Sequence, residues 1–216
     1  MNQPLAEPLL SAPAAKASEH HRARLLDAMV VALGAKRYPE ITIADIVAHA
    51  RVSKRTFYEH FPGKEECMLA LCREVSEHTL ALIAQTYHPE LDWKTQLLTT
   101  MRAYLGHLQS QPVLIRTLFI ELLAAGSRGL QVRREIGRRF ADFLRLQVEL
   151  ERQKNPKKKS LSPEVAMAVV GGINELVLQA IEEDRSDRLV DLAEPAAEFL
   201  HAVLVHLEQQ GEREAA

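Results

Sequence analysis

The sequence contains few of the residues that favour β-structure or tight loops. It has only 9 glycines in 216 residues, and aromatic residues make up 5%. Alternating apolar and polar runs, which predict strands, are nearly absent, whereas the helix formers alanine, leucine and glutamate are abundant. Since 47% of the residues are still apolar, the chain can bury a substantial core. We therefore predict an all-α globular protein.

Cysteine is also scarce, with only Cys67 and Cys72 in the chain. The two lie five positions apart on one predicted helix, so their side chains point in different directions. This spacing disfavours an internal disulfide or a shared metal. We interpret them as buried, reduced thiols, with a redox switch as the minor alternative.

Signals for secretion and membrane insertion are missing. Residues 1–18 have no basic segment followed by a continuous apolar stretch. The most apolar stretch, residues 165–181, is interrupted by Asn174, Glu175 and Gln179, and we interpret it as too polar to cross a bilayer. The expected location is the cytoplasm, with no membrane partner.

The patterns of metal sites and common enzymes are missing as well. His20 and His21 are adjacent, and His201 and His206 diverge on a helix, so neither pair has metal-ligand spacing. No phosphate-binding loop or nucleophile elbow occurs, and Gly171–Gly172 lies inside an apolar helix. We expect no metal, no cofactor and no catalysis; an all-helical enzyme or small-molecule carrier is the less favoured alternative.

What the chain does contain is a pair of short predicted helices over residues 42–64. Thr42 and Asp45 form the pattern of a capping box, and apolar residues then recur at helical spacing. After a tight turn, Ser53 can cap a second helix over residues 54–60.

The second of these helices has two chemically different faces. Phe57 and Phe61, four residues apart, can anchor one face in a core. The opposite face carries basic and hydrogen-bonding side chains and is free for an external partner. Two such helices form the helix-turn-helix unit that fits the major groove of DNA.

This stretch resembles the DNA-binding signature of the tetracycline-repressor (TetR) family. The shared features are a Thr that opens the first helix, an Ala-x-Val-Ser turn at residues 50–53, and a Tyr-x-x-Phe segment at residues 58–61 that leads into Lys64. The family usually has Gly in the turn where this chain has Arg51. Because Gly takes positive φ most easily, we expect modest strain or an altered turn at Arg51.

The polar residues around Phe57 are the candidate DNA contacts. Lys54 and Arg55 can reach base edges or phosphates, and Thr56 can meet a thymine methyl group. For His60, a phosphate contact and local packing are equally favoured interpretations. The others are predicted to contact the phosphate backbone. The full predicted set is Thr42, Ser53, Lys54, Arg55, Thr56, Tyr58, His60 and Lys64.

The distribution of charged residues along the chain gives weak support for DNA binding by residues 18–65. The net charge is −2, but residues 18–65 carry eight Lys or Arg against six Asp or Glu, whereas residues 66–216 carry eighteen against twenty-two. Phosphate neutralisation contributes to DNA affinity, so the more positive part is the one with the motif. A basic cluster that includes Arg24 is either a solvated helix end or a contact to the DNA backbone. The arginines of residues 133–139 are interpreted as a solvated face, and residues 154–159 as a surface loop.

The chain is expected to have three parts. Residues 1–17 are predicted to be a flexible arm, residues 18–65 a three-helix DNA-binding domain, and residues 66–216 a helical body for effector binding and dimerisation. In the body, a helix opens at Lys64, and further helices are predicted over about 92–110, 112–125, 127–151 and 162–183. A last helix follows a capping box at Asp191 and Glu194.

The resemblance implies a pocket for a small hydrophobic effector in this body. Polar and aromatic residues interleaved with apolar ones in the middle helices are the candidates, because pocket linings have that mixture. Ordinary core or helix surface is an equally good interpretation of each residue alone. The candidates are Trp93, Met101, Tyr104, His107, Arg116, Phe119 and Glu121.

Two consecutive and strongly apolar helices at the C-terminus suggest a homodimer held by a four-helix bundle. The resemblance implies the same arrangement. The candidate interface residues are Val169, Ile173, Val177, Leu200, Val203, Leu204 and Leu207.

The expected function is therefore a ligand-responsive repressor that binds a palindromic operator in double-stranded DNA as a homodimer. Its two recognition helices would enter successive major grooves, about 34–36 Å apart. A ligand would favour a conformation of the body that no longer matches this spacing. The alternative is a regulator without a ligand that acts through a protein partner.

Overall fold

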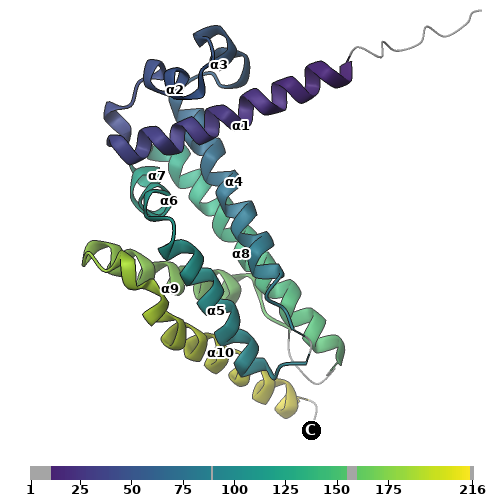
Figure 1. The fold of residues 1–216 in the computed structure, drawn as a ribbon. Helices are drawn as coiled ribbons and strands as arrows, with labels where there is room; N and C mark the ends of the chain where they lie inside the picture. The colour runs from purple at the N-terminus through teal and green to yellow at the C-terminus, as the bar shows by residue number, and fades with distance from the viewer. Residues whose placement is uncertain (1–10, 89, 155–159, 215–216) are drawn as a thin grey trace, which may run out of the picture. The chain divides into compact units, whose positions relative to one another are not determined.

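The computed structural model describes residues 11–88, 90–154 and 160–214, which contain helices and turns but no strand (Figure 1). The prediction of an all-α protein is confirmed. The chain divides into two compact units, residues 1–71 and 72–216. The division lies six residues after the predicted domain boundary at residue 65, inside a continuous helix.

The first unit contains three helices and the start of a fourth. They are α1 (Ser11–Ala35), α2 (Ile43–Ala50), α3 (Lys54–His60) and α4 (Lys64–Ala84), with a short 3₁₀ turn at Tyr38–Glu40. Because α1 begins at Ser11, the prediction of a flexible arm was wrong for residues 11–17. Several alanines there favour helix, and a proline is tolerated in a first helical turn. Residues 1–10 of the predicted arm lie outside the described residues.

The core of the first unit is small and apolar. Leu25, Met29 and Leu33 of α1 are fully buried, as are Ile46 of α2 and Phe57 of α3. α1 packs against both α2 and α3. The two helices of the helix-turn-helix motif are therefore held by one long helix through apolar contacts.

The second unit begins within α4 and continues through the remaining helices. It contains α5 (Trp93–Gln109), α6 (Pro112–Arg116), α7 (Leu122–Ala124), α8 (Gly126–Lys154), α9 (Pro163–Glu182) and α10 (Ala193–Glu214). Asp92 and Ser162 cap α5 and α9 as predicted, each accepting a hydrogen bond from a main-chain N–H.

Two predicted helices differ from the observed ones. The helix expected over residues 112–125 is divided by a π-helical segment at Thr117–Glu121. The capping box expected at Asp191 and Glu194 is not formed, because Asp191 lies inside a helical segment that leads directly into α10; the two carboxylates pair with Arg188 and Arg102 instead. A 3₁₀ segment, Ser186–Leu192, precedes α10 instead. The predicted loop at residues 154–159 falls almost entirely outside the described residues.

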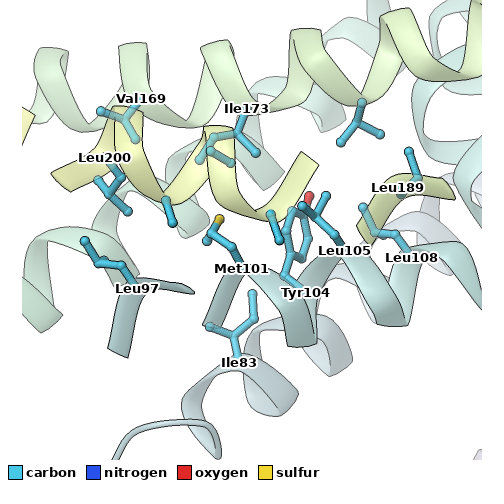
Figure 2. Packing of buried hydrophobic residues seen from close by; sticks show 14 of the residues in the cluster. Ile83, Leu97, Met101, Tyr104, Leu105, Leu108, Val169, Ile173, Leu189 and Leu200 are labelled. Atoms are coloured by element: carbon cyan, nitrogen blue, oxygen red, sulfur yellow. The ribbon is translucent and has the colours of Figure 1, made fainter. Parts of the chain in front are cut away.

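The core of the second unit is built mainly by α5, α9 and α10, with α8 packed on α9 (Figure 2). This core corrects the predicted dimer interface. Most of the proposed interface residues are buried inside the subunit: Val169, Ile173, Val177, Leu200 and Leu204 are all 8% exposed or less. Val203 is half-buried against the same core, and the side chain of Leu207 lies outside the described set.

α9 is long and apolar enough to cross a membrane by length and composition alone, which corrects our interpretation that it is too polar. Its buried residues recur along one face and pack in the core of the second unit. Core helices of soluble proteins also have this length and composition, so these two properties are weak evidence for a membrane span.

Candidate DNA-binding surface and effector cavities

α3 is anchored by its aromatic residues. Phe57 is completely buried and Phe61 is 3% exposed, and their rings lie 5.9 Å apart, centroid to centroid. Ser53 caps the helix by accepting a hydrogen bond of 3.0 Å from the Thr56 N–H. The predicted anchoring of one face is confirmed, and it fixes the direction of the opposite face.

The opposite face of α3 is open. The side chain of Arg55 is 90% exposed, Tyr58 is 57% exposed, and Lys54 is also exposed. Arg55 Nε donates to Glu59 Oε1 at 3.2 Å, one helical turn away. Exposed pairs of this kind contribute little free energy, so Arg55 can exchange Glu59 for another anion at small cost.

The capping box at the start of α2 is confirmed. Thr42 donates from its main-chain N–H and its hydroxyl to Asp45 Oδ2, at 2.8 and 2.7 Å, and the Asp45 N–H donates to Thr42 Oγ1 at 3.2 Å. Lys36 Nζ donates to the other Asp45 oxygen at 2.8 Å. Hydrogen bonds from Lys36 and Thr42 hold the pKa of Asp45 well below its usual range.

The turn between the two helices contains the expected left-handed residue. Arg51 has φ 52° and ψ 46° at the C-cap of α2, where the family usually has Gly. Arg24 of α1 donates from its guanidinium to the main-chain carbonyls of Ala50 and Arg51. Arg24, predicted to be solvated or to contact DNA, thus binds the backbone of this turn.

Lys64 has partners other than DNA. Its ammonium group donates to the carbonyls of Tyr38, Pro39 and Ile41, at 3.1, 3.0 and 2.6 Å, and lies 4.9 Å from the centre of the Tyr38 ring. An ammonium group has three N–H donors, so these contacts use all of them. We therefore leave Lys64 out of the proposed DNA contacts.

His60 lies at the edge of the packed side of α3. It is half-buried, and its ring meets that of His21 edge-on with the centroids 6.4 Å apart. A second contact joins it to Phe61, at 6.3 Å. These contacts favour the packing interpretation of His60 over the phosphate contact.

The motif geometry agrees with a comparison to known families. Residues 25–71, which include α2, the turn and α3, match the family described as bacterial regulatory proteins, tetR family. The chain carries a TetR-family DNA-binding domain. No curated protein matches the sequence.

Solved structures similar to this chain cover both of its units. The fatty acid degradation regulator FadR from Bacillus halodurans has a TM-score of 0.70 at 18% identity, over 83% of this chain and 94% of that one. FadR from Bacillus subtilis, in complex with stearoyl-CoA, has a TM-score of 0.70 at 21% identity, over 82% and 96%. RolR in complex with resorcinol has a TM-score of 0.60 at 18% identity, over 92% and 96%. At these identities the matches establish the fold.

The second unit contains a mostly apolar cavity of about 100 Å³. Three of the predicted pocket residues, Trp93, Met101 and Tyr104, line it from α5. Further walls come from α8 and α9, which contain none of the predicted pocket residues. These additional residues include Phe140, Phe143, Leu144, Gln147, Val170 and Asn174.

A second cavity, of about 60 Å³, lies in the same unit. Predicted residues Tyr104 and Phe119 line it, together with Ser76 and Thr79 of α4. Arg133 of α8 lines it too, which corrects the interpretation of this arginine as part of a purely solvated face.

The remaining three predicted pocket residues line neither cavity. His107 lies beside His78 instead, with ring centroids 6.0 Å apart. The pKa of His107 is lowered mainly by burial and, to a smaller extent, by the neighbouring His78. Arg116 Nε lies 3.8 Å from Glu121 Oε1 across the π-helical segment. Among the described residues, no group of three or more His, Cys, Asp or Glu could hold a metal ion.

Proposed function

We propose that the protein is a ligand-responsive transcriptional regulator that binds a two-fold symmetric operator as a homodimer in the cytoplasm. The observation that carries the proposal is the exposed polar face of α3, anchored by Phe57 within a TetR-family domain. A rigid helix with such a face fits the major groove. The contacts that we propose are Thr42, Ser53, Lys54, Arg55, Thr56 and Tyr58.

Arg55 is the residue most suited to read a base, because its guanidinium is 90% exposed and can bind guanine through two hydrogen bonds. The test begins with selection of bound DNA fragments by the purified protein, followed by titration of the selected site. Replacing Arg55→Ala is expected to cost about 1–3 kcal/mol and to relax preference at one base pair. Lys94→Ala, which removes an exposed positive charge from the second unit, is the control and should leave the preference intact. An unchanged sequence preference in Arg55→Ala would remove this assignment.

The homodimer is proposed on the outward face of α9 and α10 rather than on the buried residues first predicted. Phe199 is 43% exposed and lies so close to Gly172 that a Cβ there would meet its ring at 3.4 Å. Ala168 and Gly171 on α9, and Ala202 on α10, extend the exposed small and apolar surface. Small residues allow two helix pairs to approach closely, and an apolar face of this kind favours a covering partner.

Sedimentation of two variants tests the dimer. Phe199→Glu places a charge on the proposed face and is expected to shift the protein toward monomer. Leu146→Glu adds the same charge at another exposed apolar residue, 55% exposed on α8, and should sediment as the wild type does. Equal behaviour of the two variants would contradict the proposed interface.

The effector is proposed to bind in the cavities of the second unit. Structures with the same fold are complexes with stearoyl-CoA or resorcinol, so this fold accommodates ligands of different size and chemistry. Thermal-shift and operator-release screens with hydrophobic compounds test the proposal. If no compound changes both the melting temperature and the operator affinity, regulation through a protein partner becomes the favoured function.

A further inference from the structure

The two cavities of the second unit share one wall. Four residues line both of them: Tyr104, Phe140, Val170 and Asn174. The rings of Tyr104 and Phe140 lie 6.0 Å apart, centroid to centroid, and are inclined at 55°. These four side chains form the partition between the cavities.

The cavities follow one another along the helices. On α5, Trp93 lines the first cavity and Leu108 the second; on α8, Gln147 lines the first and Arg133 the second. With a rise of 1.5 Å per residue, each of these pairs spans roughly 20 Å. A ligand that fills both cavities is therefore elongated.

The two ends of this path differ in chemistry. Among the described residues, none with a charged side chain lines the first cavity. The lining of the second includes Ser76, Thr79 and Arg133. No hydrogen bond or ion pair within the described part of the chain engages the half-buried Arg133 guanidinium. Such a group favours an anion, and a carboxylate matches its planar geometry.

The partition carries two polar groups that have no hydrogen-bond partner among the described residues. Tyr104 is only 8% exposed, and its ring extends away from α5 with the hydroxyl at the far end (Figure 2). Neither this hydroxyl nor the Asn174 amide forms a hydrogen bond with any described residue. Both residues line the two cavities, so the hydrogen-bonding capacity of these groups is available to a polar ligand atom there.

We propose that the effector is an elongated amphiphilic carboxylate with a neutral hydrogen-bonding group at its neck, an inference that rests on the proposed ligand-responsive function. The apolar tail lies in the first cavity, the neck contacts Tyr104 and Asn174, and the carboxylate pairs with Arg133. One water-sized group needs roughly 10–15 Å³ of such space, so the two cavities hold on the order of eight and five such groups. A medium-length acyl chain joined through an amide to a short carboxylate has about this size.

Three matched probes, titrated calorimetrically into the full chain, test the ligand class. N-octanoylglycine has the apolar tail, the amide neck and the carboxylate. Its methyl ester lacks the negative charge, and undecanoate has the same backbone length without the amide. N-octanoylglycine is expected to bind about tenfold more tightly than the ester and several-fold more tightly than undecanoate, because each lacks one polar contact. Absence of these two preferences would overturn the proposal.

Variants assign the preferences to residues. Arg133→Gln is expected to abolish the preference for the acid over its ester, whereas Arg134→Gln, at the adjacent exposed arginine, should retain it. Tyr104→Phe keeps the ring but removes the hydroxyl, so it should reduce the preference for the amide over undecanoate. Melting temperatures without ligand check that each variant is folded. Identical selectivity in Arg133→Gln and Arg134→Gln would also overturn the proposal.

Operator binding separates this inference from the function on which it rests. If N-octanoylglycine binds with the expected selectivity but leaves operator affinity unchanged, the ligand class stands and ligand-responsive regulation fails. If a compound of other chemistry releases the operator while N-octanoylglycine does not bind, the function stands and the ligand class fails.

Discussion

Arg24 Nη2 donates a hydrogen bond of 3.1 Å to the main-chain carbonyl of Arg51, and the same nitrogen contacts the carbonyl of Ala50. A side chain of α1 thereby holds the backbone where α2 ends in a left-handed residue. The contact links the longest helix of the first unit to the turn that sets the direction of α3. The geometry of the proposed DNA-binding face consequently depends on a residue outside the motif.

Replacing Arg24→Ala is expected to lower the free energy of unfolding by about 1–3 kcal/mol, because the partly buried Ala50 carbonyl loses its donor. Arg24→Lys keeps the charge but not the planar fork of donors, so it should recover only part of the loss. Denaturant unfolding followed by circular dichroism measures both changes. Equal stability of Arg24→Ala and the wild type would show that the contact is not stabilising.

Arg51→Gly is expected to stabilise the protein by about 1 kcal/mol. A left-handed residue with a Cβ costs roughly 1–2 kcal/mol, and the greater freedom of Gly in the unfolded chain offsets roughly 0.4–1 kcal/mol of the gain. Arg51→Ala keeps the Cβ and serves as the control, since it should give no comparable gain. The measurement is the same unfolding titration, and a destabilised Arg51→Gly would contradict the strain at this turn.

Lys64→Met is expected to lower the free energy of unfolding by about 1–3 kcal/mol, because three main-chain carbonyls lose a charged donor. The salt dependence of operator binding should remain that of the wild type. Lys54→Met is the matched comparison: it should leave stability unchanged and reduce the slope of log affinity against log salt by about 1 if Lys54 contacts a phosphate. A reduced slope in Lys64→Met would restore it as a DNA contact.

His107 should make stability depend on pH. Its pKa is lowered in the folded protein by burial and by His78, so the unfolded chain binds a proton more readily. The stability present above the unfolded pKa of about 6.5 should therefore fall as the pH drops from there toward the folded pKa. His107→Gln is expected to lose less stability than the wild type between about pH 7 and pH 5. Melting curves across this range, with His20→Gln as an exposed control, provide the check.

Local signals in the sequence predicted local structure well. The caps at Thr42, Asp92 and Ser162 form as expected because each is a contact between residues three apart in the chain. The left-handed Arg51 could be expected for the same reason, since the turn is short. The predicted arm extended into α1 because residues 1–17, rich in proline and alanine, were expected to bury too little surface to become ordered, whereas alanine also favours helix.

The walls of the cavities could not be predicted in this way. Tyr104 on α5 and Asn174 on α9 line the same two cavities although seventy positions separate them in the sequence. Residues of α6 and the π-helical segment were chosen as pocket candidates for their mixture of polar and aromatic types. The mixture of residue types does not indicate which side of a helix faces a cavity. Arg116 and Glu121 were therefore among the predicted pocket residues, and Arg133 was not.

The sequence by itself determined an all-α protein with a helix-turn-helix whose second helix has one apolar and one polar face. Both properties depend on the spacing of residues within single helices. Only the tertiary structure decided which sides of α9 and α10 are inside the subunit, which partners Arg24 and Lys64 bind, and where the cavities lie. A helix that is apolar on most sides can pack in several orientations, and the orientation adopted is set by side chains distant in the chain.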